Sequence, residues 1–119
     1  MEADFTIEFY ETGGGACPVR DFLEDLKGSD PNDFAAVMAG LAKLRRRNYH
    51  REPLSKALGG GLFELRHVGK LNTRILWVFI EDRRIVALHG VRNEGRAIPA
   101  RDIEIARQRM RDLRKGEDR

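Results

Sequence analysis

The first half of the chain changes from an alternating pattern of apolar and polar residues to apolar residues at helical spacing. Residues 5–10 alternate, which predicts a strand with its apolar side chains on one face. Pro18 suits the first turn of a short helix, and Asp30 followed by Pro31 is typical of the N-cap and first position of a second helix. The second helix carries an apolar series that we expect to pack in the core: Phe34, Val37, Met38, Leu41 and Leu44.

Three strand-like runs follow a connector over residues 50–61, and they occupy Leu62–Val68, Thr73–Ile80 and Arg84–Val91. The links between the runs are short enough for hairpins, so we expect antiparallel pairing. The middle run is apolar on both faces, which predicts a central strand covered on both sides. The glycine triplet at 59–61 lacks the Lys-Ser/Thr of a P-loop, and we expect it to form a turn into the first run.

The last part of the chain predicts a helix that begins at Pro99. The predicted element order is therefore β-α-α-β-β-β-α, which favours an α+β fold with a small, mainly antiparallel sheet packed with helices. A length of 119 residues predicts one domain, 1–119. Four residues form the apolar stripe of the last helix: Ile103, Ala106, Met110 and Leu113.

Basic residues are concentrated in the second half of the chain. Residues 1–60 contain 8 Lys and Arg against 10 Asp and Glu, whereas residues 61–119 contain 14 against 9. Arginine accounts for 17 of the 22 basic residues, and its planar guanidinium matches phosphates and base edges. This composition is compatible with a nucleic-acid partner and, equally, with a salt-bridged surface. No apolar run is long enough to span a membrane and no signal segment is evident, so we expect a cytoplasmic protein.

The histidines and the single cysteine do not form a metal-binding pattern. No two of the three histidines have metal-ligand spacing, and Cys17 stands alone, so we expect neither a metal nor another cofactor. The pKa of histidine near neutrality would suit His89 for proton transfer, but its position in a predicted buried strand favours a hydrogen-bonded core residue. We expect His50 and His67 to lie at the surface.

Four segments of the second half follow one another in a characteristic order. Leu58–Arg66 reads LGGGLFELR, Thr73–Trp77 reads TRILW, Ile85–Val91 reads IVALHGV, and residues 99–106 read PARDIEIA. They resemble, in the same order and at matching spacings, the segments LxGGLxELR, YRILY, IVLLHGF and PxxEIxxA of the RelE/HigB-like toxins, in the HigB-type branch first described from phage proteins. Pro18, Val19, Phe22 and Leu23 also resemble the first helix of that family, so the match covers nearly the whole chain.

This resemblance implies a RelE-like fold and a function as the toxin of a type II toxin–antitoxin system. It further implies a metal-independent endoribonuclease (an mRNA interferase) that cuts mRNA on the ribosome and so inhibits translation. The implied partners are the ribosome, mRNA and a cognate helix-turn-helix antitoxin, through which the protein would meet DNA only indirectly.

The same resemblance implies that Arg74 contacts the scissile phosphate, and we expect Arg66 and Arg92 to complete the catalytic set. Cleavage of RNA without a metal uses the 2′-OH as the nucleophile and needs charge stabilisation at the phosphate as well as proton transfer. Arginine suits the first task, whereas its high pKa suits it poorly for the second. Two of these arginines have an alternative role in an ion pair, with Glu64 or Glu81 for Arg74 and with Glu64 for Arg66.

The chain departs from the family pattern directly after the His-Gly segment. The family has a variable residue and two lysines there, whereas this chain has Arg92, Asn93 and Glu94. The departure supports an alternative function, a catalytically weakened or inactive RelE-like module that binds an antitoxin or RNA without cleavage. Six further basic residues are candidates for RNA binding: Lys56, Lys70, Arg96, Arg45, Arg46 and Arg47. The arginine triplet at 45–47 is expected to close the second helix, where it also suits the negative end of the helix dipole. For the two lysines, plain solvation is the alternative.

Overall fold

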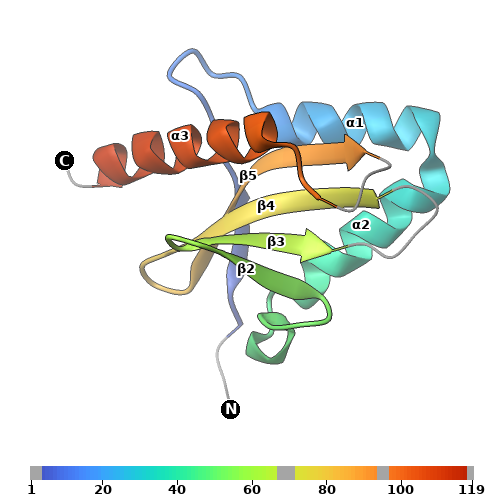
Figure 1. Cartoon of the computed structure of the whole chain (residues 1–119), viewed down its shortest axis with the longest axis horizontal. Coiled ribbons are helices and arrows are strands. Elements are labelled where there is room, and N and C mark those ends of the chain that lie inside the picture. The colour runs from blue at the N-terminus through green and yellow to red at the C-terminus, as the bar shows by residue number, and fades with distance from the viewer. Residues whose placement is uncertain (1–3, 67–71, 94–96, 118–119) are drawn as a thin grey trace.

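The computed structural model describes residues 4–66, 72–93 and 97–117 of the chain. These residues form five strands, three α-helices and one short 3₁₀-helix (Figure 1). In chain order the elements are β1 (Thr6–Phe9), α1 (Pro18–Ser29), α2 (Pro31–Lys43), η1 (Arg47–Tyr49), β2 (Ser55–Gly59), β3 (Leu62–Arg66), β4 (Asn72–Ile80), β5 (Arg84–Asn93) and α3 (Ala100–Glu117).

The strands form one sheet in the order β1-β5-β4-β3-β2. Strand β1 runs parallel to β5, and every other neighbouring pair is antiparallel. The α+β fold with a small, mainly antiparallel sheet is therefore confirmed, and β4 is the central strand that its apolar sequence predicts. Strand β2 was not predicted, because Ser55–Gly59 has no apolar alternation and becomes a strand only by pairing along β3.

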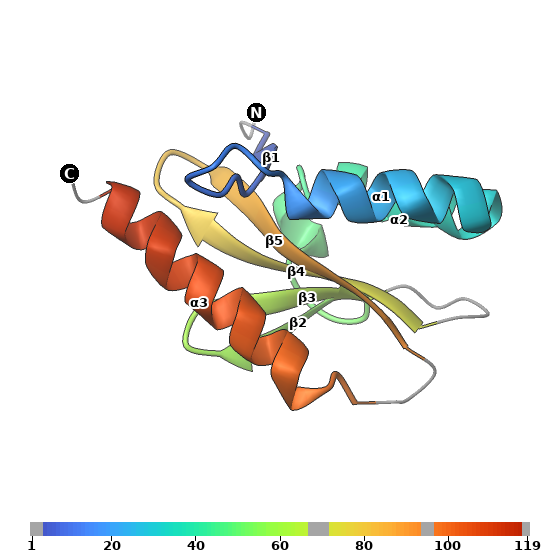
Figure 2. The same ribbon diagram turned by 90° about the horizontal axis from the view of Figure 1, so that it is seen from above.

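Helices cover both faces of the sheet. Figure 2 shows α1 and α2 on one face and α3 lying across the other. The apolar side chains divide accordingly, with Leu65, Ile75 and Trp77 in the α1/α2 layer and Leu76 and Val78 in the α3 layer. Among the described residues, no helix has both the length and the apolar character needed to cross a membrane. The predicted stripe of α3 lies in the α3 layer: Ile103, Ala106, Met110 and Leu113.

Helix α2 begins as predicted and ends earlier than the arginine triplet suggested. The backbone N–H of Asp33 donates to the Asp30 carboxylate at 3.1 Å, which makes Asp30 the N-cap. The helix ends at Lys43, so the three arginines at 45–47 lie after it. Met38 was wrongly assigned to the core and is 39% exposed, because helical geometry turns it away from the face shared by Val37 and Leu41.

The predicted turn at 59–61 joins β2 to β3, and its backbone requires glycine. All three residues, Gly59, Gly60 and Gly61, have a positive φ, at 94°, 64° and 89°. Side chains with a Cβ rarely adopt this left-handed conformation. The triplet therefore serves a tight hairpin turn.

His50 is packed inside the α1/α2 layer rather than at the surface, contrary to the sequence expectation. Its ring lies edge-on to Phe5 at a centroid distance of 4.7 Å and to Phe79 at 5.1 Å. Its Nε2 lies 2.6 Å from the backbone oxygen of Leu44, just beyond α2. His50 therefore ties the end of α2 to the sheet, a role that no local sequence pattern signals.

Gly90 permits the close contact between β5 and α1. A Cβ built at Gly90 would lie 2.4 Å from Cδ2 of the Phe22 ring. We expect Gly90→Ala to lower the free energy of unfolding by about 1–3 kcal/mol through overpacking, as measured by urea denaturation. The matched control is Gly28→Ala in α1, where nothing lies within 4 Å and stability should stay equal or rise slightly. An unchanged midpoint for Gly90→Ala would contradict rigid packing here.

Candidate functional site

Three basic side chains and one carboxylate share the α3 face of the sheet at one end of β3 and β4. Arg66 of β3 is the direct partner of Arg74 of β4, and Lys56 of β2 is the direct partner of Glu64 of β3. Directly paired residues project to the same face, as do residues two apart along a strand. The antiparallel register therefore brings the two predicted arginines together, with Glu64 between them and Lys56 on the exposed edge strand.

Glu64 is buried and lies between the two arginine side chains. Its Oε1 is 3.5 Å from Nε of Arg66, and its Oε2 is 3.5 Å from Nε of Arg74. Glu64 is only 4% exposed and Arg74 only 6%. Both alternatives foreseen from the sequence, pairing of Arg66 and pairing of Arg74 with Glu64, are thus realised at the same carboxylate. Two guanidinium groups therefore share one buried carboxylate.

The contacts of Glu64 are long for ion pairs. Charge-assisted hydrogen bonds are about 2.7–2.9 Å, so distances of 3.5 Å mark attraction without tight hydrogen bonding. The Oε2 atom of Glu64 accepts no hydrogen bond from the described residues. Glu64 therefore positions the arginine side chains without saturating them, and an incoming anion could compete for the same groups.

Arg66 is the accessible member of the pair. Its side chain is 38% exposed, and its Nη1 lies 3.4 Å from the Oε1 of Glu52, whose side chain is 66% exposed. Glu52 belongs to the segment before β2, so Arg66 reaches from the sheet toward that segment. An exposed ion pair of this kind contributes little to stability, typically about 0–1 kcal/mol, and it leaves the Arg66 side chain able to move.

Arg92 does not join the other two arginines. Its partner in the register is Thr73, whose hydroxyl donates to Asp33 of α2, so both side chains lie on the α1/α2 face. The guanidinium of Arg92 donates to Asp30 at 3.0 Å and to Ser29 at 3.2 Å, at the junction of α1 and α2. The structure therefore brings together two of the three predicted catalytic residues and places the third on the opposite face.

A bulge in β5 causes this separation. Val86 and Leu88 pack in the α3 layer, and strict alternation would continue on that face to Arg92. The register between β4 and β5 shifts between Leu76 and Trp77, which inserts one extra residue in β5. Beyond the bulge each residue of β5 therefore projects to the face opposite to the one that alternation predicts.

The predicted RNA-binding residues are dispersed. Lys56 is exposed on the same face of the sheet as Glu64. Arg45 lies at the other end of the sheet, where its backbone oxygen accepts a hydrogen bond from Phe5 and its side chain pairs with Asp4 at 3.4 Å. Arg46 follows it directly, and Arg47 begins η1. Five residues named in the sequence analysis lie outside the residues whose side chains the structure describes: His67, the RNA-binding candidates Lys70 and Arg96, and Asn93 and Glu94, which stand where the toxin family has two lysines.

His89 is hydrogen-bonded at both ring nitrogens, which confirms the expected structural histidine. Its Nε2 lies 2.7 Å from the Oδ1 of Asp102 in α3, and its Nδ1 lies 3.1 Å from Nη1 of Arg109. Arginine can only donate, so Nδ1 accepts and the ring proton sits on Nε2, donating to Asp102. His89 therefore fastens α3 to β5, and neither nitrogen is available to a substrate in this arrangement.

Arg109 extends the same contact toward β1. Its Nη1 also donates to the backbone oxygen of Leu88 at 2.8 Å, and burial lowers the pKa of this guanidinium. The guanidinium lies 5.9 Å from the centroid of the Tyr10 ring. The Tyr10 hydroxyl donates to Asp112 at 2.5 Å, and that hydrogen bond raises the pKa of Tyr10. These contacts stabilise the packing of α3 against the sheet. They lie on the face of the sheet that α3 covers.

Within the described part of the chain, no group of three or more His, Cys, Asp or Glu side chains is placed to hold a metal ion. The charged side chains that the structure brings together at this end of the sheet are Lys56, Glu64, Arg66 and Arg74. Sequence reasoning treated Glu64 as a rival partner of each arginine and missed that it joins them. Strand alternation did place Glu64 and Arg66 on one face, but only the register of β3 with β4 adds Arg74.

Comparison with known proteins identifies one family. The model of the family described as "Phage derived protein Gp49-like (DUF891)" matches residues 22–111, which is well over half of the chain. The matched span contains the three predicted catalytic arginines and Glu64. No curated protein matches the chain significantly.

Proposed function

The chain belongs to the family of phage-derived Gp49-like proteins, and on that premise we propose that it is the toxin of a type II toxin–antitoxin system, a ribosome-dependent endoribonuclease that cleaves mRNA. The observation that carries the proposal is the convergence of Arg66 and Arg74 on Glu64, with Lys56 at the adjacent edge. The segments that resemble RelE/HigB-like toxins include both arginines and so give independent support.

In the proposed mechanism, the 2′-OH of the RNA loses its proton and its oxygen attacks the adjacent phosphate. A 2′,3′-cyclic phosphate forms as the bond from phosphorus to the 5′-oxygen breaks, and that leaving oxygen takes up a proton. Negative charge grows on the phosphate oxygens in the transition state, and Arg66 and Arg74 stabilise it. Glu64 positions the two guanidinium groups before the RNA arrives, and its long contacts allow them to turn to the phosphate. The ribosome holds the message in a fixed geometry, and orientation alone can lower a barrier by several kcal/mol.

A partner protein is part of this proposal. We expect a cognate helix-turn-helix antitoxin to neutralise the toxin and to supply any contact with DNA. The expectation rests on the resemblance to type II toxins. The arginine groups on the α3 face are the part of the protein whose covering would block the proposed reaction.

The direct test is cleavage of a defined message in a purified translation reaction, read by primer extension. We expect cuts within the translated region and none in the same RNA without ribosomes. A message with 2′-deoxyribose at the mapped position should stay intact there, because the nucleophile is missing. Cutting of the deoxy-substituted position would contradict the mechanism, and an intact message in the translation reaction would contradict the activity.

A non-catalytic binding module is the second candidate function. Both arginines contact Glu64, Arg92 is paired with Asp30, and the family's two lysines are replaced by Asn93 and Glu94. Such a module would bind the antitoxin or the ribosome normally and leave every message intact. Co-sedimentation with ribosomes, run beside the cleavage assay, distinguishes the two functions.

A further inference from the structure

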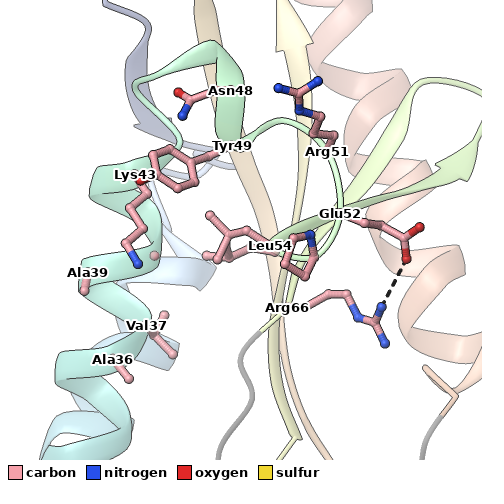
Figure 3. Close-up of a pocket in the computed structure, with 13 residues that line it drawn as sticks. Ala36, Val37, Ala39, Lys43, Asn48, Tyr49, Arg51, Glu52, Leu54 and Arg66 are labelled. Carbon is pink, nitrogen blue, oxygen red and sulfur yellow. Dashed lines mark hydrogen bonds and ion pairs between the residues drawn. The ribbon is translucent and has the colours of Figure 1, made fainter.

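A groove with a volume of about 500 Å³ opens beside Arg66, between α2 and the segment that leads into β2. We call it the α2 groove, and Figure 3 shows Leu54 between Lys43 on one side and Arg66 on the other. Its volume falls within the range of about 300–1,000 Å³ that is typical of small-molecule sites. Its lining is formed by Ala36, Val37, Ala39, Gly40, Lys43, Asn48, Tyr49, Arg51, Glu52, Pro53, Leu54, Leu65 and Arg66.

The wall of the α2 groove is apolar and its rim is basic. Val37 and Leu65 are buried core residues, and Leu54 packs against the same core. The rim carries Lys43 and Arg51, with Arg66 beside them, against one carboxylate at Glu52. A flat apolar body with an attached negative charge would match both features.

An aromatic ring and an amide complete the lining. The Tyr49 ring is half-buried in the groove wall, and Nζ of Lys43 lies 5.7 Å from its centroid. Exposed Asn48 directly precedes it. Aromatic rings stack on nucleobases with any sequence, and side-chain amides can bond to base edges.

Arg66 links the α2 groove to the site described above. Its guanidinium lies 3.5 Å from Glu64 on the sheet face and 3.4 Å from Glu52 at the groove. In an RNA chain, each phosphate is bonded directly to the sugars of two neighbouring nucleotides. When a phosphate is bound at Arg66, the base of a neighbouring nucleotide is therefore held close to the opening of the groove.

We infer that the α2 groove binds an unstacked base of the RNA next to the phosphate held by Arg66 and Arg74. This inference rests on the proposed function, because it takes that phosphate as given. An apolar protein segment would suit the wall alone, and an acidic segment would have to compete with the phosphate for Arg66. An RNA nucleotide satisfies the wall and the rim together.

The test compares binding with and without bases, independently of cleavage. The probes are dye-labelled 2′-O-methyl hexanucleotides of A, C, G or U and a ribose-phosphate hexamer of equal length without bases. The 2′-O-methyl group prevents the 2′-oxygen from attacking, so binding is measured without cutting. Fluorescence anisotropy at one fixed salt concentration gives each Kd for the full chain.

Two alanines of α2 provide a matched pair of variants. Ala39 lines the groove and Ala42 does not, and both are exposed. We expect at least one of the base-containing probes to bind wild type about tenfold more tightly than the abasic probe, the scale of one stacked base. Ala39→Phe fills the groove and should bring that ratio to about one, whereas Ala42→Phe should keep the wild-type ratio.

The outcomes separate this inference from the proposed function. A wild-type ratio in Ala39→Phe, or no base dependence in wild type, overturns the base site even where mRNA is cleaved. Loss of antitoxin neutralisation with an unchanged ratio also overturns it and assigns the groove to a protein. The protein could also bind base-containing probes more tightly, lose this preference in Ala39→Phe and yet cleave no message. That result would support the base site and contradict only the proposed nuclease activity. If circular dichroism shows Ala39→Phe unfolded, Tyr49→Leu replaces it and should lower the ratio by removing the ring.

Discussion

Replacement of Arg66 and Arg74 together by alanine is expected to abolish the growth arrest caused by induced expression of the protein. In the translation reaction, we expect the cleavage rate to fall by about 10²–10³-fold or more, the scale set by loss of one group that stabilises developing charge. Each single variant should cost nearly as much as the pair, because groups that act on one transition state are not additive. Arg74→Ala is the more informative single change, since the resemblance to the toxin family places that residue at the scissile phosphate.

The control for this prediction is Arg111→Ala. Arg111 lies on α3, its side chain is 59% exposed, and its ion pair with Glu104 is a surface contact. The Arg111→Ala substitution removes a guanidinium from α3 and leaves Arg66 and Arg74 in place, so toxicity and cleavage should stay near wild type. Normal toxicity of the folded Arg66→Ala/Arg74→Ala protein would remove the assigned site. Equal loss in Arg111→Ala would show that total charge, and not position, sustains activity.

The second large effect is expected for Glu64→Gln. Loss of the carboxylate removes the negative charge that lies between the buried guanidinium of Arg74 and that of Arg66. We expect the free energy of unfolding to fall by about 3 kcal/mol, the lower end of the cost of breaking a buried ion pair, because Arg66 is partly exposed. Urea denaturation of purified protein measures it.

The control is Glu52→Gln, which removes the exposed partner of the same Arg66. Its cost should stay below about 1 kcal/mol, because exposed ion pairs contribute little. Added sulfate should raise the midpoint of Glu64→Gln more than that of wild type or Glu52→Gln, since the anion can take the place of the lost carboxylate. Sulfate stabilises folded proteins in general, so the informative quantity is the rise in midpoint of Glu64→Gln beyond that of wild type and Glu52→Gln. Equal stability of both variants would show that Glu64 does not hold the arginine pair.

Much of the fold could be predicted from local patterns. Alternation identified β1, and the apolar series identified the inward face of α3 and, apart from Met38, that of α2, because each pattern repeats with the period of its element. Two predictions failed where local pattern carries no signal. Strand β2 exists through its pairing with β3, and His50 packs against the rings of Phe5, directly before β1, and of Phe79 in β4.

The site was predictable in part. The arginines were found through segments that resemble a toxin family, and their chemistry follows from the guanidinium group alone. Their common carboxylate and the α2 groove were not predicted, because both depend on residues that are distant along the chain. Tyr49, Leu54 and Leu65 reach one groove only after α2 has packed on the sheet.

The sequence by itself determined most of the element types, the basic second half and the residues able to stabilise a phosphate, since these follow from side-chain chemistry and periodicity. Only the tertiary structure decided which of those residues meet. The register of β3 with β4 sets Arg66 beside Arg74, and one extra residue in β5 turns Arg92 to the other face. Side chains alternate with a period of two, so a single inserted residue reverses the face of every residue beyond it, and that insertion depends on pairing between strands.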